Sequence, residues 1–382
     1  MKKMMFCAAM VAALLGFVSC GTEYVAPVEG SQKGFALSFF KNVAKSVAQD
    51  ENIVVSPYSA GVALSMVAEG AEGETRTEFD KALNGCLFKA VDLGSNDTVT
   101  VKSANSVWIT DDFSVRNRYV GLLEKDFDAF VTTLNFADPA TVQAINNWCS
   151  ENTEGKITEI VDRLSPNAVM MLVNALYFNA PWETPFLERN TKEMVFHSLS
   201  GDVQAPMMSK TEYLNYAEYQ GCQMVELPYE GGRYSMFVVL PSESLGVDKM
   251  LSYVNENLYE QALSMMNSAK VRLTMPKLKL ETSLVLNKTL QNMGVKTAFT
   301  SAANFKGIAE MGPLVLDQVK QKCYIDVTEK GTEAAAVTSV GIRLTSARPE
   351  TVVTMTVDRP YLFFIADRND GNIFFAGRIV NL

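Results

Sequence analysis

The stretch Glu329-Lys-Gly-Thr-Glu-Ala-Ala-Ala-Val-Thr-Ser-Val-Gly-Ile-Arg-Leu-Thr-Ser-Ala-Arg-Pro349 differs from the rest of the chain because it is long, small and polar. It lies between two apolar, β-branched segments, residues 324–327 and 352–355, which have the composition of strands. Loops of this length inside a compact domain are uncommon and are usually functional. The stretch therefore predicts an exposed functional loop.

The same stretch alternates in the way that a half-buried strand does. One face collects small or apolar side chains, namely Thr332, Ala334, Ala336, Thr338, Val340 and Ile342. The other face carries the charged side chains of Glu333 and Arg343. Because successive strand residues point to opposite sides, the segment suits both an exposed loop and a strand inside a sheet. A solvated loop with accidental alternation is the simpler alternative on the pattern alone.

The composition of the 382 residues is that of a globular protein, with 48% hydrophobic and 20% charged residues. A net charge of −9 argues against a sequence-independent grip on nucleic acid, because such proteins cluster Lys and Arg. The single histidine, His197, excludes zinc sites built on paired histidines. A Ser-His-Asp hydrolase would have to use His197, and no nucleophile elbow is recognisable. We therefore expect no enzyme, no metal and no cofactor.

The N-terminus has the layout of a secretory signal. Two lysines follow Met1, an apolar run covers residues 4–18, and Ser19-Cys20-Gly21 supplies small residues. The run is shorter than the roughly 20 residues that span a membrane comfortably. We expect a signal peptide over residues 1–19; an uncleaved anchor or an ordinary helix is the alternative.

Cys20 follows small and apolar residues, as the lipid-modified cysteine of a bacterial lipobox does. This similarity predicts an exported protein that is lipid-anchored to the bacterial envelope, facing the periplasm or the cell surface, through a tether over residues 20–30. Without lipidation Cys20 is a free thiol near the new terminus, and the protein is secreted. Contact with a membrane is expected only through this anchor.

The remaining chain predicts one α+β domain over residues 31–382, without a linker or repeat. Ser56-Pro57 is a helix start with a capping serine and proline at the first position, and this helix ends at Gly70. Residues 144–161 predict a further helix, and residues 101–110, 170–179 and 234–240 predict strands. Asp370-Gly371 between two apolar runs predicts a hairpin near the C-terminus.

Several long motifs follow one another along the chain. They are Asn52-Ile-Val-Val-Ser-Pro-Tyr-Ser-Ala-Gly-Val-Ala-Leu-Ser-Met66, Gly70-Ala-Glu-Gly-Glu-Thr75, Ala104-Asn-Ser-Val-Trp108, Thr153-Glu-Gly-Lys-Ile157, Leu172-Val-Asn-Ala-Leu-Tyr-Phe178, Val225-Glu-Leu-Pro-Tyr229, Glu329-Lys-Gly-Thr-Glu-Ala-Ala-Ala336 and Asp358-Arg-Pro-Tyr-Leu-Phe-Phe364. With these motifs, the chain from about Ser31 to Leu382 resembles the serpins. The resemblance implies the serpin fold, with a large central mixed β-sheet, smaller sheets, about eight helices and a long exposed reactive-centre loop at about residues 329–352.

The resemblance also implies a suicide-substrate protease inhibitor. A protease cuts the loop and becomes acyl-linked to it, and the hinge, residues 331–342, then inserts as a new strand in the main sheet. The residues that match the hinge are Glu329, Gly331, Thr332, Glu333, Ala334, Ala335 and Ala336. Small side chains at Thr332 and Ala334 suit entry into a packed core, where an unpaired charge would cost several kcal/mol. A serpin that has lost inhibition and acts as a binding or carrier protein is the alternative.

Counting along the hinge as the family lays it out places the cleaved bond at Thr345–Ser346. Rival recognition residues are Arg343, Leu344 and Arg348. Thr345 suits an elastase- or subtilisin-like protease, the arginines suit trypsin-like enzymes, and Leu344 suits a chymotrypsin-like one. The expected partners are therefore serine proteases, with cysteine proteases as an additional class, and we expect a monomer.

The chain departs from the serpin pattern in three places. Gln321 stands where the family usually has a histidine under the main sheet, while Ser56 and Asn174 match the other polar residues of that cluster. A short stretch between Glu78 and Ala104 lacks most of the helix that some serpins use for heparin, so activation by heparin is not expected. Val337 replaces the alanine that is typical of fast inhibitors, and its outward parity predicts a modest effect.

Overall fold

The computed structural model describes residues 30–332 and 351–382, except for residues 92, 97, 166–167 and 311–313. Its helices are α1 Gln32–Ser46, α2 Pro57–Glu69, α3 Gly73–Ala82, α4 Asn117–Phe127, α5 Pro139–Asn152, α6 Val247–Tyr253, α7 Glu256–Ser264 and α8 Asn287–Asn292, with two 3-10 turns, η1 Glu188–Asn190 and η2 Thr297–Phe299. Its strands are β1 Ile53–Val55, β2 Thr100–Thr110, β3 Ala129–Leu134, β4 Met170–Pro181, β5 Lys192–Ser198, β6 Gly201–Tyr219, β7 Cys222–Pro228, β8 Tyr234–Pro241, β9 Asn267–Pro276, β10 Leu278–Val285, β11 Lys320–Val327, β12 Gly331–Thr332, β13 Val353–Thr356, β14 Tyr361–Asp367 and β15 Ile373–Ile379.

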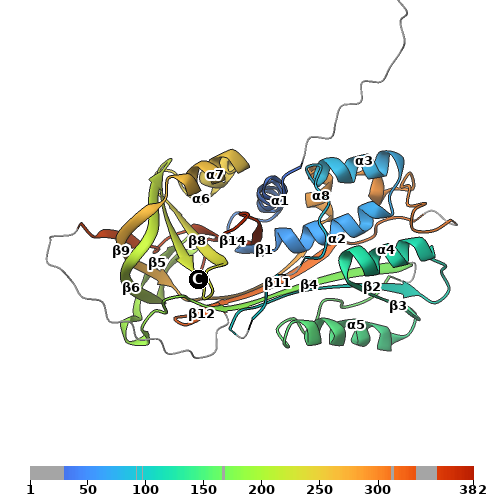
Figure 1. The fold of residues 1–382 in the computed structure, drawn as a ribbon, viewed down its shortest axis with the longest axis horizontal. Helices are drawn as coiled ribbons and strands as arrows, with labels where there is room; N and C mark the ends of the chain where they lie inside the picture. The colour runs from blue at the N-terminus through green and yellow to red at the C-terminus, as the bar shows by residue number, and fades with distance from the viewer. Residues whose placement is uncertain (1–29, 92, 97, 166–167, 311–313, 333–350) are drawn as a thin grey trace, which may run out of the picture.

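Two sheets organise the molecule. A nine-stranded sheet has the order β1-β15-β14-β8-β7-β6-β9-β13, with β5 paired to β6. A six-stranded sheet has the order β10-β11-β12-β4-β2-β3 and contains parallel as well as antiparallel pairs. Figure 1 shows α2 and α5 on opposite faces of this second sheet. The expected α+β architecture, with a large mixed sheet and eight helices in the described chain, is confirmed.

Helix α2 forms as its sequence predicts. Ser56 is the N-cap and accepts a hydrogen bond from the Ser59 amide, Pro57 occupies the first turn, and Gly70 is the C-cap. Eleven of its thirteen residues are buried, so the helix lies inside the main core instead of on the surface. It therefore packs against the face of the six-stranded sheet opposite α5.

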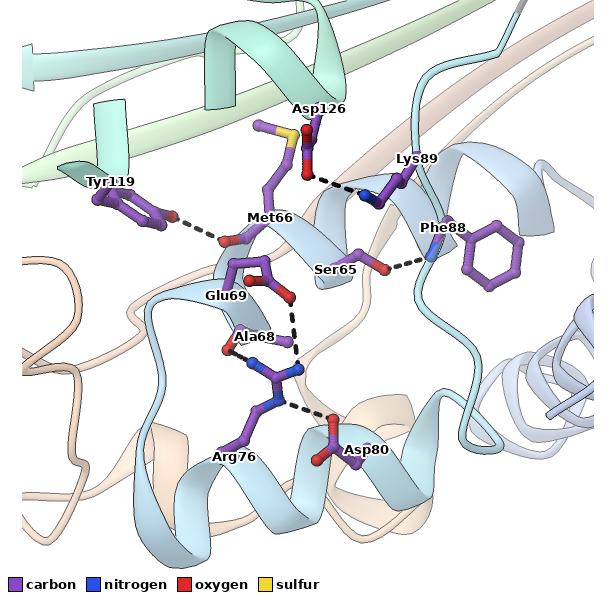
Figure 2. A network of polar contacts seen from close by, with 10 residues as sticks. All are labelled: Ser65, Met66, Ala68, Glu69, Arg76, Asp80, Phe88, Lys89, Tyr119 and Asp126. Carbon is purple, nitrogen blue, oxygen red and sulfur yellow. Dashed lines mark hydrogen bonds and ion pairs between the residues drawn. The ribbon is translucent and has the colours of Figure 1, made fainter. Parts of the chain in front are cut away.

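Polar contacts fix the helices around α2, as Figure 2 shows. The Arg76 guanidinium of α3 donates to the carbonyl of Ala68 and pairs with Asp80, at 3.0 and 2.8 Å. The hydroxyl of Tyr119 in α4 donates to the Met66 carbonyl at 2.8 Å, and Phe88 N–H donates to Ser65 Oγ at 2.9 Å. These contacts satisfy buried polar groups on three sides of α2 and hold it in one position.

Helix α5 is shorter than the sequence predicts. The expected helix over residues 144–161 ends at Asn152, because Glu154 and Gly155 adopt left-handed backbone angles that a right-handed helix cannot continue. The following segment, residues 153–161, crosses the sheet without regular structure. Asn146 holds the end of this segment, since its side chain accepts hydrogen bonds from the amides of Ile160 and Val161.

The space under α5 forms a small core of its own. It consists of Trp108, Ile145, Cys149, Ile157, Ile160, Val161, Val173 and Ala175 and is separate from the main core. The segment after α5 is attached on both sides: Lys102 of β2 pairs with Glu154, while Lys322 of β11 donates to the Glu159 carbonyl at 3.0 Å. Lys156 also lies over the ring of Tyr324 in β11, 5.3 Å from its centroid. The segment therefore spans the gap between β4 and β11.

The predicted C-terminal hairpin is confirmed. Strand β14 pairs antiparallel with β15, and Gly371 takes a positive φ of 74° in the turn between them. Both strands are buried along their whole length in the nine-stranded sheet.

Candidate functional site: the hinge and the gap in the sheet

The start of the predicted hinge is already part of the six-stranded sheet. Strand β12 is antiparallel to both neighbours, with Thr332 opposite Val327 of β11 and opposite Ala180 of β4. Glu329 and Thr332 are 6% and 2% exposed. The sequence predicts an exposed loop that begins at about Glu329, whereas residues 329–332 lie within the fold, because backbone and side-chain contacts hold them there.

Thr332 is held by a side-chain hydrogen bond. Its Oγ1 lies 2.7 Å from the hydroxyl of the buried Tyr229. Gly331 precedes it with a φ of +151°, and a Cβ at this position would lie 2.2 Å from the carbonyl oxygen of Ala180. Only glycine fits this conformation and this close approach.

Glu329 makes the charged contacts of the hinge. Its carboxylate pairs with Lys277 Nζ at 2.9 Å and accepts a hydrogen bond from Thr191 Oγ1 at 2.8 Å. Burial raises the pKa of Glu329, but the contacts with Lys277 and Thr191 outweigh it and hold the pKa below its usual value of 4.5. The carboxylate therefore stays ionised and joins the hinge to β9–β10 and to the segment before β5.

Backbone contacts complete the attachment. The Trp182 amide donates to the Lys330 carbonyl at 2.9 Å, and the Phe186 amide donates to the Glu329 carbonyl at 2.8 Å. The indole N–H of Trp182 donates to the Thr328 carbonyl at 3.0 Å. The carbonyls of three successive residues, 328–330, are therefore satisfied by residues that follow β4.

The predicted polar cluster lies between the start of α2 and strands β4 and β11. Gln321 of β11 accepts from the Ser56 amide at 3.1 Å and donates to the Ser56 carbonyl at 2.8 Å. Asn174 of β4 reaches this pair through Ser59, whose hydroxyl donates to Asn174 Oδ1, and Asn174 also donates to Asn105. The structure thus brings Ser56, Asn174 and Gln321 together and adds Ser59 and Asn105, which the sequence motifs do not indicate. Helical spacing from Ser56 could have indicated Ser59, whereas nothing local indicates Asn105.

A cavity of about 710 Å³ continues the gap toward the far end of the sheet. Its wall includes Met170 and Leu172 of β4, Gln321 of β11, Val319 just before β11, and Ala63 of α2. Apolar side chains share this wall with polar and charged ones, among them Arg163, Asp317 and Lys320. The part formed by Met170, Leu172 and Val319 suits the apolar face of an alternating strand. The gap between β4 and β11 is filled by β12 at one end and is open at the level of this cavity.

The other predicted site residues lie outside the described residues. These are Glu333, Ala334, Ala335 and Ala336 of the hinge, the proposed bond Thr345–Ser346, the rivals Arg343, Leu344 and Arg348, and the lipidation residue Cys20. Within the described part of the chain, no group of three or more His, Cys, Asp or Glu residues could hold a metal ion. His197 is exposed on the β5–β6 hairpin, where its Nδ1 lies 2.8 Å from Asp202. No helix among residues with a described placement is long and apolar enough to cross a membrane.

Comparison with known proteins gives the family. The sequence model described as Serpin (serine protease inhibitor) matches residues 30–382. The chain belongs to the serpin family. It is 33% identical to an uncharacterised serpin-like protein of Thermococcus kodakarensis, over 93% of this chain and 86% of that protein. It is 32% identical to Iripin-2 of Ixodes ricinus, over 98% of each chain.

Solved serpin structures share the fold. The thermophilic serpin tengpin in its native state superposes with a TM-score of 0.84 at 30% identity, covering 92% of this chain and 93% of tengpin. Thyroxine-binding globulin in complex with thyroxine superposes with a TM-score of 0.80 at 24% identity, covering 92% and 98% of the two chains. The second likeness shows the fold alone. Serpins are generally inhibitors of proteases and not catalytic enzymes.

Proposed function

We propose that this serpin is a suicide-substrate protease inhibitor whose cleaved loop inserts between β4 and β11. The observation that carries the proposal is β12, which already pairs with both strands and fixes the register of any continuation. Insertion converts unpaired backbone groups of β4 and β11 into ladder hydrogen bonds on both sides of the new strand.

The register predicts where each loop residue would lie. Thr332 lies opposite Ala180 and Val327. Six residues further along the loop, and six residues back along each neighbour, Thr338 would lie between Asn174 and Gln321. Thr338 is the one polar residue after Thr332 on the face of small and apolar side chains. On insertion it would therefore meet the polar cluster of Ser56, Asn174 and Gln321. Val340 and Ile342 would follow at the level of Leu172 and Met170, where the cavity lies.

The chemistry of the trap follows from this geometry. The nucleophile of the protease attacks the carbonyl of Thr345, the amino group of Ser346 leaves, and the acyl bond joins the protease to the inserting half of the loop. Insertion then carries the protease along the sheet before water can hydrolyse the acyl bond. A site near Thr345 leaves enough chain to fill the gap, whereas cleavage at Arg343 shortens the insertable strand and favours simple turnover.

The targets we propose are serine proteases with elastase-, subtilisin- or trypsin-like pockets, with cysteine proteases as a further class. Arg343, Leu344 and Arg348 provide alternative bonds, so one loop would serve proteases of several specificities. The inhibitor acts as a monomer in this proposal.

A carrier function is the alternative, and an apolar cavity away from the gap is a candidate ligand site for it. A small apolar cavity of about 40 Å³ lies between α7 and the nine-stranded sheet, lined by residues such as Met224, Phe237 and Leu258. It has room for about three water molecules. A small-molecule carrier would need this cavity to open, whereas the gap beside β12 needs no such change, so inhibition is favoured.

The location of the protein is proposed from the sequence. A lipid on Cys20 would hold the inhibitor at the bacterial envelope through residues 20–30, where it would protect the envelope from proteases. Removal of the thiol by Cys20→Ala should release the protein from membrane fractions.

The decisive experiment mixes the protein with an elastase-, a subtilisin- and a trypsin-like protease and analyses the products on denaturing gels. A band at the summed mass, with the cut located by mass spectrometry, is the expected result. Cleavage without an adduct by all three proteases, together with an unchanged melting temperature of the cleaved form, would contradict the proposal, because an inserted strand must raise that temperature.

A further inference from the structure

A largely buried lysine of β6 lies close to the hinge. Because alternate residues of a strand point to the same side, Lys210 lies on the core side of β6 with the buried Met208 and Leu214. It lies opposite Leu273 of β9, which is also buried. The side chain of Lys210 is 10% exposed. Lysines are almost never buried to this extent unless their charge is paired, so the contacts of Lys210 must offset the cost of its burial.

Lys210 contacts the segment that follows β4, residues 182–187, which we call the clamp segment. Its Nζ donates to the carbonyl oxygen of Thr184 at 2.8 Å and lies 4.8 Å from the centroid of the Phe186 ring. Glu212, two residues further along β6, supplies the opposite charge at 3.2 Å. An ammonium that donates to a carbonyl and lies over an aromatic ring stabilises the position of both groups. Lys210 therefore attaches the clamp segment to β6.

The clamp segment in turn holds the hinge at both of its ends. The amide of Phe186 donates to the carbonyl of Glu329 at 2.8 Å. The ring of Phe186 packs edge-on against Trp182, with 6.4 Å between the ring centroids. Trp182 stacks on Tyr229 at 4.5 Å, and the hydroxyl of Tyr229 contacts Thr332. A continuous series of contacts therefore leads from Lys210 through the clamp segment to residues 329–332.

Lys210 and Lys277 act on different groups of the hinge. Lys277 pairs with the carboxylate of Glu329 at 2.9 Å. Lys210 instead contacts the ring of Phe186, whose amide holds the backbone carbonyl of Glu329. A substitution of Lys210 therefore leaves the ion pair of Glu329 in place and changes only the backbone attachment of the hinge.

From these contacts we propose that Lys210 is a positioning residue for inhibition: it orients the clamp segment so that the hinge stays docked and ready to insert. The proposal rests on the proposed inhibitory function, because a docked hinge matters only if the loop inserts. Replacing a buried ion pair by uncharged side chains of similar size is often neutral or stabilising for the whole fold. A lysine with only a packing role would therefore leave the hinge unchanged when its space is filled.

The test uses a double variant, Lys210→Met with Glu212→Gln, which removes the ammonium and its carboxylate partner and nearly keeps their size. Lys210→Arg is the conservative variant, since a guanidinium also donates to carbonyls and packs on aromatic rings. The matched control is Lys33→Met, because Lys33 of α1 is also paired with a glutamate, Glu260 of α7. Figure 1 shows α1 and α7 far from β12.

Hydrogen exchange of the uncleaved protein measures docking without any protease. In the double variant, the amides of the clamp segment and of residues 331–332 should exchange about tenfold faster than in the wild type, because a hydrogen bond from a charged donor is lost. Exchange in β8 should not change, and the melting temperature should not fall. Lys210→Arg and Lys33→Met should both exchange within about threefold of the wild type. With an elastase-like protease, the double variant should consume at least about twofold more inhibitor per protease inactivated, because fewer molecules have a docked hinge.

Unchanged exchange in the hinge of the double variant would overturn the inference, and so would faster exchange spread equally over the clamp segment, the hinge and β8. An equal effect of Lys33→Met, or a loss of protection in Lys210→Arg as large as in the double variant, would also overturn it. None of these results needs a protease, so they are distinguishable from failure of the proposed function. If the wild type forms no adduct but the hinge of the double variant exchanges faster, the trap is rejected and the role of Lys210 in docking stands.

Discussion

The register of β12 predicts opposite effects for the same substitution at two adjacent loop residues. Ala334 would insert between Phe178 and Ile325, which are 4% and 2% exposed and belong to the main core. Glu333 would insert on the other side of the sheet, between the half-buried Asn179 and Asp326. We therefore expect Ala334→Arg to stop insertion and Glu333→Arg to leave it nearly unchanged.

The free-energy cost of inserting each arginine follows from the burial of the residues that would flank it. An arginine at residue 334 must place a guanidinium among apolar side chains, where an unpaired ion costs several kcal/mol even after relaxation. A cost of about 4 kcal/mol in the transition state for insertion slows this step by about 10³-fold. Arginine at residue 333 would meet the carboxylate of Asp326 in a partly solvated position, where an ion pair contributes about 0–1 kcal/mol.

The assay titrates an elastase-like protease with each variant and measures the inhibitor consumed per protease inactivated. Wild type and Glu333→Arg should consume nearly the same amount of inhibitor per protease inactivated. Ala334→Arg should consume at least about tenfold more, because hydrolysis of the acyl bond outruns insertion. If Ala334→Arg traps protease as efficiently as Glu333→Arg, the register and the side assigned to each residue are wrong.

Four further predictions rest on the hinge and the N-terminus. Thr332→Arg should turn the inhibitor into a substrate, since it also removes the contact with Tyr229; equal trapping efficiency on denaturing gels would argue against insertion. Gly331→Ala should undock β12, because the added methyl meets the Ala180 carbonyl, and hydrogen exchange should show a loss of protection at Thr332. Because the folded-state pKa of Glu329 is depressed, its ion pair stabilises the hinge above the usual pKa of 4.5 and is lost as pH falls through the lower folded-state value. Glu329→Gln should remove this part of the acid sensitivity in melting curves, and an unaltered pH profile would show that the contact with Lys277 does not stabilise the hinge. Cys20→Ala should abolish lipid labelling and membrane attachment, and unchanged attachment in fractionation would exclude the lipid anchor.

Local signals in the sequence predicted much of the fold. The Ser56-Pro57 cap indicated the start of α2, and Asp370-Gly371 indicated the hairpin between β14 and β15. The alternation from Thr332 onward indicated a segment suited to a sheet, and the structure shows Thr332, its first residue, paired there. Helix α5 was predicted too long, because the left-handed angles at Glu154 and Gly155 are not visible in the apolar periodicity.

The contacts that hold the hinge could not be predicted, because they join residues far apart in the chain. Tyr229 and Thr332 are 103 residues apart, and Thr191 and Glu329 are 138 apart. No periodicity connects such pairs, and their meeting depends on the packing of two sheets. For the same reason the sequence indicated Ser56, Asn174 and Gln321 only through the family resemblance, and Asn105 not at all.

In the proposed insertion mechanism, the segment after α5 would make the time course of insertion uneven. The first inserting residues would lie opposite Phe178 and Ile325, in the part of the gap next to β12. Further along the gap lie Tyr324 and Lys322 of β11. There Lys156 and the carbonyl of Glu159 attach the segment after α5 to β11. In the register of β12, Val337 would arrive opposite Lys322 and Ala175, on the face that the small core under α5 covers. A fast first stage would then be followed by a pause until the segment lifts. The extra methyl groups of Val337, compared with the alanine of fast inhibitors, would lengthen that pause modestly and so shift the competition between trapping and release of the protease slightly toward release.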